Sequence, residues 1–110
     1  MTILGLDPGS AKTGYGIIEK QRGSKLECIT YGCITTSPSE NKSARLLSLE
    51  KQLLEVLKHH RPDMAAVESL FFFKNLKTVM PVSEARGVIL LTLARYKIPI
   101  FEFSPLQVKM

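Results

Sequence analysis

Two short apolar segments of this chain each end in a single acidic residue. Residues 2–7 read Thr-Ile-Leu-Gly-Leu-Asp, and residues 64–68 read Met-Ala-Ala-Val-Glu. Short, nearly uninterrupted apolar runs are typical of strands buried in the centre of a sheet. A carboxylate at the end of such a strand costs free energy unless it has a partner or a function. Asp7 and Glu68 are therefore the first candidates for a functional site.

Turn residues and hydrophobic periodicity divide the chain into strands and helices. Leucines at three- and four-residue spacing predict a helix over residues 42–60. Pro81 marks the start or a kink of a second helix that runs to about Lys97, and Ser104-Pro105 predicts the start of a third. Residues 70–80 fit either a loop or a short irregular helix. We expect strands over residues 2–7, 13–20, 25–36, 64–68 and 98–103.

The connections between these elements predict one mixed α/β sheet. Short links make the first three strands an antiparallel meander, and the helical crossover that follows makes the fourth strand parallel to the first. A five-stranded sheet in the order 3-2-1-4-5, with flanking helices, satisfies every connection. The first and fourth strands are then neighbours about 4.8 Å apart. Asp7 and Glu68 would emerge together at the edge where open sheets bind ligands.

Two unpaired carboxylates so close together repel each other, and this repulsion predicts their chemistry. One of them would bind a proton, or both would bind a divalent cation. Carboxylate and water oxygens suit Mg²⁺, and two such ions can promote the hydrolysis of a phosphodiester. Each acid could instead only cap its strand or pair with a lysine. The matched positions of Asp7 and Glu68 favour the metal site.

The composition indicates one small globular domain over residues 1–110. Of its residues 45% are hydrophobic, and the net charge is +5. This charge suits a polyanionic partner such as nucleic acid, and it fits a merely soluble basic protein equally well. No apolar run reaches the ~18 residues of a membrane span, and Asp7 interrupts the first run before it could serve as a signal peptide. We therefore expect a cytoplasmic protein with no membrane contact.

The two cysteines predict no disulfide. Cys28 and Cys33 are five residues apart on one expected strand. An odd offset places them on opposite faces. We expect both to be small, reduced core residues.

The glycine-rich turn after Asp7 is not a phosphate-binding P-loop. Gly14 is followed by Tyr15 rather than Lys, and the turn leads into a strand rather than a helix. Ser10, Lys12 and Thr13 could contact phosphate, although solvated turn residues are an equally good account.

Three successive phenylalanines, residues 71–73, follow Glu68 closely. At least one of them should be exposed near the acids, where an aromatic face can stack on an unpaired base. The alternative is that two of the three pack beneath the loop. We expect both, with Phe71 as the residue that meets DNA.

Six short motifs stand out along the chain. They are Leu4-Gly5-Leu6-Asp7-Pro8-Gly9-Ser10, Thr13-Gly14-Tyr15-Gly16, Ala66-Val67-Glu68-Ser69-Leu70-Phe71, Lys74-Asn75, Ala85-Arg86-Gly87 and Gln107-Val108-Lys109. In content and order they resemble the RuvC-type Holliday-junction resolvases. The resemblance implies a ribonuclease H-like fold and a homodimeric endonuclease, dependent on Mg²⁺ or Mn²⁺, that nicks two strands of a four-way DNA junction symmetrically. It also implies that the protein acts together with a helicase complex that drives branch migration of the junction.

The resemblance implies roles for individual residues. Asp7 and Glu68 match two of the family's four catalytic, metal-binding positions. Phe71 matches a residue that stacks on a base, Lys109 matches one that binds phosphate, and Lys74 lies in a matching motif as a further candidate DNA contact.

The resemblance also bears on assembly and on the extent of the chain. The helix over residues 82–97 is apolar nearly all round from Val88 on, so its outer face would be covered by a dimer partner or by a further helix. The family's other metal ligands lie in a later segment, so we expect a nuclease domain truncated at its C-terminus. Such a chain would be an endonuclease or only a junction-binding module.

Overall fold

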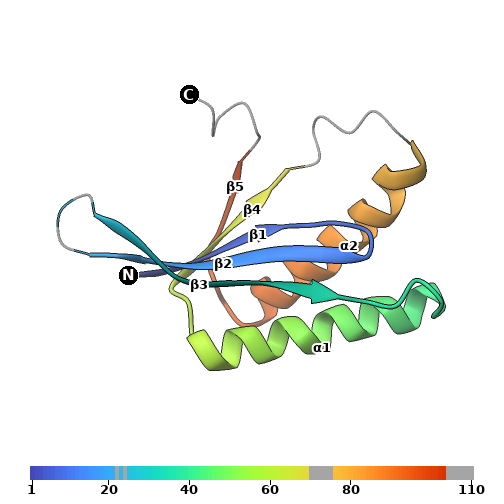
Figure 1. The fold of residues 1–110 in the computed structure, drawn as a ribbon, viewed down its shortest axis with the longest axis horizontal. Coiled ribbons are helices and arrows are strands. Elements are labelled where there is room, and N and C mark those ends of the chain that lie inside the picture. The colour runs from blue at the N-terminus through green and yellow to red at the C-terminus, as the bar shows by residue number, and fades with distance from the viewer. Residues whose placement is uncertain (22, 24, 70–75, 104–110) are drawn as a thin grey trace.

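In the part of the chain that the structure describes, one mixed sheet packs against two helices (Figure 1). The structure is a computed structural model that describes residues 1–21, 23, 25–69 and 76–103. The sheet order is β3-β2-β1-β4-β5, as predicted, with β1 antiparallel to β2 and parallel to β4. The elements are β1 (Thr2–Asp7), β2 (Lys12–Lys20), β3 (Leu26–Thr35), α1 (Lys42–His60), β4 (Met64–Glu68), α2 (Leu76–Arg95) and β5 (Ile100–Phe103).

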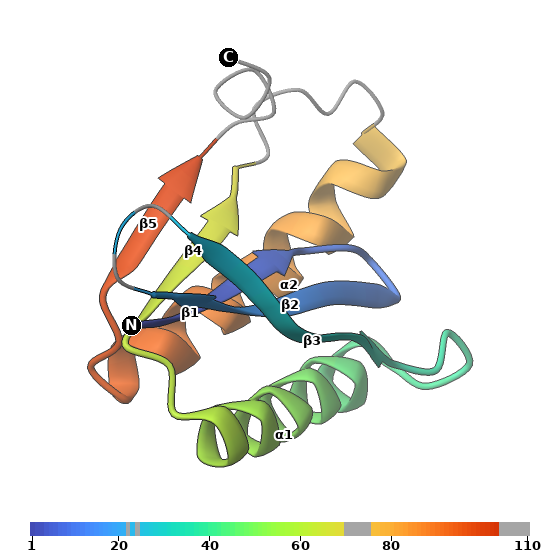
Figure 2. The same cartoon turned by 60° about the vertical axis from the view of Figure 1, so that its left-hand side comes forward.

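The core lies between one face of the sheet and the two helices, which pack against each other (Figure 2). Leu4, Leu6, Ala65 and Val67 of the two central strands are at most 2% exposed. Because side chains alternate along a strand, the residues between them point to the opposite face. The apolar stripe that covers these central strands comes from both helices: Leu49, Leu53, Val56 and Leu57 of α1, and Ala85, Ile89 and Leu93 of α2.

Helix α1 begins and ends as its sequence predicts. The side chain of Asn41 accepts a hydrogen bond of 2.8 Å from the N–H of Ala44, which satisfies one of the unpaired amides of the first turn. At the other end Arg61 adopts a left-handed conformation with φ 46°, and its N–H donates to Leu57. Pro62 follows and cannot continue the helix.

Helix α2 begins earlier than Pro81. It starts at Leu76, so Pro81 lies inside the helix rather than at its first turn. The part of the region 70–80 that the structure describes is thus helical. Strand β5 is shorter than predicted and begins at Ile100. The third predicted helix lies outside the described residues. No described helix is both long and apolar enough to cross a membrane.

The prediction that Cys28 and Cys33 lie on opposite faces of the sheet, in the core, is wrong. Between Ile17 and Ile18 the register with β3 shifts, so that Ile29 is an extra, unpaired residue. The extra residue turns the odd offset between the cysteines into an even one. Both therefore lie on the face away from the helices, and both are exposed.

Candidate metal and nucleic-acid site

The structure brings Asp7 and Glu68 together at the carboxyl ends of two neighbouring strands. In the parallel ladder of β1 and β4, Leu6 pairs with Val67, and the two acids come next. Since Leu6 and Val67 are buried beneath the sheet, the acids point to the opposite face. Asp7 is exposed and Glu68 is half-buried.

The Asp7 carboxylate alters the protonation of Glu68. A hydrogen bond between the Glu68 and Asp7 side chains, assisted by burial and by the negative charge of Asp7, raises the pKa of Glu68 to about 7. Glu68 therefore carries a proton in weak acid and donates it to Asp7. Above that pH two negative charges would face each other without compensation.

The pair fits a hard divalent cation. Its donors are all carboxylate oxygens, it is open to water, and it has an excess of negative charge. Across residues 1–21, 23, 25–69 and 76–103, no three His, Cys, Asp or Glu side chains gather as a metal-binding group. Asp7 and Glu68 are therefore the candidate ligands in this part of the chain.

Arg86 is a residue of this site to which the sequence reasoning gave no role. From α2, its Nε donates to the backbone carbonyl of Glu68 at 3.3 Å, and its Nη2 forms an ion pair with Glu102 of β5. Arg86 thus connects α2 to the ends of two strands and holds the backbone of Glu68. A signal was present, because Arg86 falls between Val82 and Ile89 on the buried side of the helix, where a cation needs a partner.

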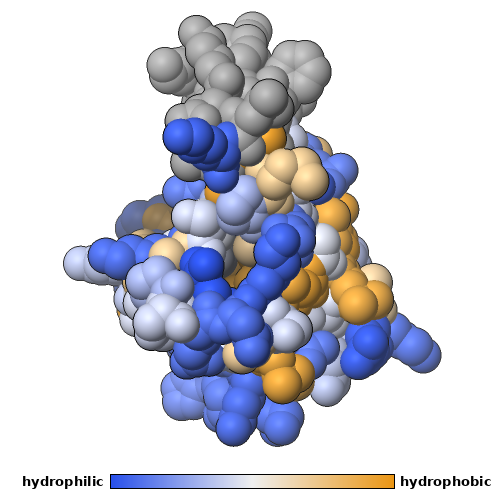
Figure 3. All heavy atoms as spheres, turned by 90° about the vertical axis from the view of Figure 1, so that its right-hand side faces the viewer, coloured by the Kyte–Doolittle hydropathy of each residue, from blue (hydrophilic) through white to orange (hydrophobic). Residues whose placement is uncertain are grey.

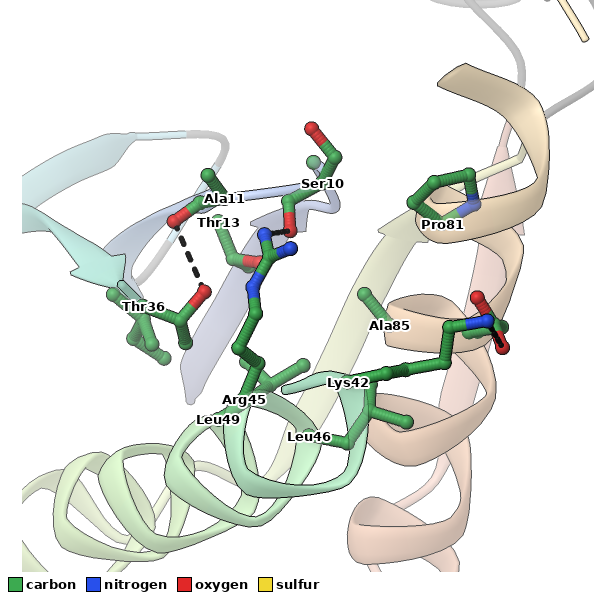
Figure 4. A pocket seen from close by; sticks show the side chains of 13 residues that line it. Ser10, Ala11, Thr13, Thr36, Lys42, Arg45, Leu46, Leu49, Pro81 and Ala85 are labelled. Atoms are coloured by element: carbon green, nitrogen blue, oxygen red, sulfur yellow. Dashed lines mark hydrogen bonds and ion pairs between the residues drawn. The ribbon is translucent and has the colours of Figure 1, made fainter. Parts of the chain in front are cut away.

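The turn after Asp7 is tightly folded and tied to α1. A Cβ atom at Gly9 would overlap the backbone carbonyl of Lys12, so the turn requires glycine there. The Arg45 side chain donates from Nη2 to the carbonyl of Ser10 at 2.7 Å, as Figure 4 shows. Ser10 and Lys12 are both exposed, so their side chains are accessible to a ligand beside Asp7. The buried Thr13, 2% exposed, is not.

The remaining predicted DNA contacts lie outside the described residues. These are Phe71, Lys74 and Lys109. Their roles stay predictions.

The outer side of α2 carries an exposed apolar stripe. Met80 is 63% exposed and Leu91 is 55% exposed. Ser83, Gly87 and Ala94 lie on the same side of the helix and are exposed too. Figure 3 shows that hydrophobic surface gathers toward the right-hand side of that view, while hydrophilic side chains dominate much of the rest. A partner that covered this stripe would remove apolar surface from water.

Comparison with known proteins gives a consistent result. A family model described as "Crossover junction endodeoxyribonuclease RuvC" matches residues 3–110. The protein of that name from Caldicellulosiruptor saccharolyticus is 51% identical over 109 residues, which are 99% of this chain and 66% of that protein. The one from Petrotoga mobilis is 48% identical with the same shares. This chain therefore spans about two thirds of the length of these relatives.

A solved structure agrees with these matches. T. thermophilus RuvC in complex with a Holliday junction substrate has a TM-score of 0.89 to this chain, with 29% sequence identity. The similarity covers 99% of this chain and 69% of the other.

Proposed function

We propose, because this chain belongs to the RuvC family of crossover junction endodeoxyribonucleases and has its ribonuclease H-like sheet, that it serves Holliday-junction resolution by metal-dependent hydrolysis of DNA phosphodiesters. The carboxylate pair of Asp7 and Glu68 is the observation that carries the catalytic part of the proposal. The pair lies at the sheet edge where such folds place ligands, and it gains its second negative charge only when Glu68 loses its proton.

Asp7 and Glu68 would hold Mg²⁺ or Mn²⁺. When bound, such a cation lowers the pKa of a coordinated water and neutralises charge on the phosphate. The chain's own residues prepare the site for it. Glu68 gives up its proton, and Arg86 fixes the backbone of Glu68 through its carbonyl oxygen.

The proposed substrate is four-way junction DNA. The T. thermophilus relative was solved in complex with a Holliday junction substrate, and the net charge of +5 favours a polyanion. Ser10, in the turn after Asp7, and Lys12, at the start of β2, are both exposed, and we assign both to contact with a backbone phosphate at the site. Phe71 would stack on a base, and Lys74 and Lys109 would contact phosphate. A branch-migration helicase complex would act on the same junction in the cytoplasm.

The proposed assembly is a homodimer through α2, within the predicted range 82–97. Two copies related by a two-fold axis would each contribute one site, which suits paired nicks in the two strands of a symmetric junction. Leu91, which lies in this range and is 55% exposed, supports this surface, and the exposed Met80 lies just before it.

The dimer is testable with two matched substitutions. Leu91→Arg should convert a dimer to a monomer in sedimentation velocity, because a charge would be buried at the interface. Leu47→Arg on α1 is the control, since Leu47 is 65% exposed and lies on the other helix. A dimer that survives Leu91→Arg, or one that both variants disrupt equally, would contradict the proposed surface.

Cleavage is tested with a labelled four-way junction and Mg²⁺. Asp7→Asn and Glu68→Gln should each lower nicking by about 100-fold or more, as expected for loss of a metal ligand, while gel-shift affinity for the junction stays the same. Glu55→Gln changes an exposed carboxylate of α1 and should leave nicking unaltered. Full nicking by either site variant would refute the catalytic role.

The alternative is a module that binds junctions without cutting them. The observation in its favour is that the described residues bring only two acidic ligands together. Binding of the junction in preference to linear duplex, with no nicking, would establish this alternative. Equal affinity for junction and duplex would reject both functions.

A further inference from the structure

A pocket separate from the carboxylate pair opens between the turn after β1, the first turns of α1 and the middle of α2 (Figure 4). Its volume is about 120 Å³. Arg45 rises from α1 to the turn, and Lys42 stretches from α1 to Glu84 on α2, so the two cations frame the opening. The proposed nuclease function assigns no role to this pocket beyond the DNA contact proposed for Ser10 at its rim.

The floor of the pocket is apolar and well packed. Ile34, Leu49 and Ala85 line it and are 3–4% exposed, and Leu46 lies beside them. An apolar cavity of about 150 Å³ in another protein stays dry and binds benzene. A space of the size seen here therefore suits one six-membered ring.

The pocket wall also holds a polar atom that lacks a partner. Nε of Arg45 is buried, and of the buried side-chain nitrogens and oxygens in the described part of the chain it is the one without a hydrogen bond. Nη2 of the same side chain is already bonded to Ser10. A buried donor without an acceptor is unfavourable. Because solvent does not reach this atom, a ligand oxygen would accept from it only after the Arg45 side chain turns toward the pocket.

The charge at the opening selects the kind of acceptor. Lys42 and Arg45 are positive, and Glu84, at 3.2 Å from Lys42, is negative. The surplus is one positive charge. An anionic acceptor on an apolar ring satisfies both the orphaned N–H and this surplus.

We propose that this pocket is a binding site for a small single-ring carboxylate, with the ring against Ile34, Leu49 and Ala85 and the carboxylate on Arg45. Such a ligand would contact the turn at Ser10 and helix α2 at the same time. The proposal concerns binding alone and stands or falls independently of any cleavage by the chain.

The test is a methyl-resolved NMR titration of the 110-residue chain with sodium benzoate. Saturable shifts are expected at the methyl groups of Leu46, Leu49 and Ala85, with a Kd of about 1 mM, as is typical of so small a ligand. Benzamide has the same ring without the charge and should bind about tenfold more weakly. No saturable shift at these methyls, or equal affinity for benzoate and benzamide, would overturn the proposal.

Variants locate the charge that is recognised. Arg45→Met keeps an apolar stem and should weaken benzoate about tenfold, the loss expected for one charge-assisted bond. Lys42→Met changes an exposed side chain, so the variant should fold normally. It should also weaken benzoate binding, because it leaves the negative charge of Glu84 without its ion-pair partner. Arg95→Met is the control, since Arg95 pairs with Glu50 away from the pocket and should have no effect. Unchanged affinity in the Lys42 and Arg45 variants would refute recognition by these cations.

A second pocket in the same chain provides an internal control. It is lined by Leu54, Leu57 and Ile98, with Lys58 and Arg61 at its edge, and its volume is about 280 Å³. Benzoate that binds there as tightly as at Ala85 would show only general affinity for apolar, basic surface, and the proposed site would be rejected.

Discussion

Glu68→Gln should make the metal-free protein more stable at pH 8 and leave its stability nearly unchanged at pH 5. The pKa of Glu68 rises from its ordinary value of 4.5 to about 7 on folding, because of its hydrogen bond to Asp7. A carboxyl group whose pKa is raised stabilises the fold fully below pH 4.5, and this contribution is lost as the pH rises through 7. Glutamine retains a donor toward Asp7 and carries no charge at any pH, so the variant escapes that loss.

The size of the effect follows from the change in proton affinity. Each tenfold change in affinity is worth about 1.4 kcal/mol, so the full change would amount to about 3 kcal/mol without screening. Glu68 is only half-buried and Asp7 is exposed, so water reduces the repulsion to about 1 kcal/mol. In a domain of this size, that corresponds to a Tm about 5 °C higher for the variant at pH 8.

The assay is thermal unfolding followed by circular dichroism between pH 4 and 9, with EDTA and then with Mg²⁺. Mg²⁺ should raise the Tm of the native chain at pH 8 and raise that of Glu68→Gln much less. Glu55→Gln serves as the control for removal of one exposed carboxylate. A variant that is less stable than the native chain at pH 8, or a difference that does not depend on pH, would refute the picture of two opposed carboxylates.

Three further outcomes are expected. Mg²⁺ binding should release about one proton at pH 6 and almost none at pH 8, because Glu68 must lose its proton before the cation binds. Titration calorimetry in two buffers of different ionisation enthalpy measures the number of protons released. Equal release at both pH values would contradict the prediction. Gly9→Ala should lower the free energy of unfolding in urea by about 2 kcal/mol, because the added Cβ would overlap a backbone carbonyl. Gly87→Ala adds a Cβ that meets no atom within 4 Å and should raise the free energy of unfolding by about 0.5–1 kcal/mol. Similar effects at the two sites would be inconsistent with this geometry. Arg86→Met should weaken the affinity for Mg²⁺ about tenfold by releasing the backbone of Glu68, and Arg86→Lys should recover part of that affinity. Unaltered affinity in both variants would show that Arg86 has a structural role only.

The sheet order was predictable because each link in it depends on local sequence. The apolar runs and the short turns fix the meander, and the amphipathic stretch 42–60 fixes a crossover that has to be helical. Once β1 and β4 are neighbours and parallel, the ends of both strands meet. Asp7 and Glu68 then lie side by side because each is the residue that ends its apolar run.

What could not be predicted depends on contacts between distant elements. The extra residue Ile29 in β3 has no turn signal of its own, and it moves Cys28 to the face opposite to the one expected from alternation. The two bonds of Arg86 require knowledge of how α2 lies across β4 and β5. The pocket at Arg45 likewise arises only after α1, α2 and the first turn have packed together.

The parallel pairing of β1 with β4 makes the acidic pair a product of long-range folding. The chain between β1 and β4 contains β2, β3 and α1, so docking of β4 beside β1 closes a long loop and costs entropy before any contact is gained. A nascent chain that has formed the first hairpin and α1 still lacks the second acid beside Asp7. Luminescence from a bound terbium ion during refolding would therefore report when β4 pairs with β1. No such signal is expected before these two strands pair.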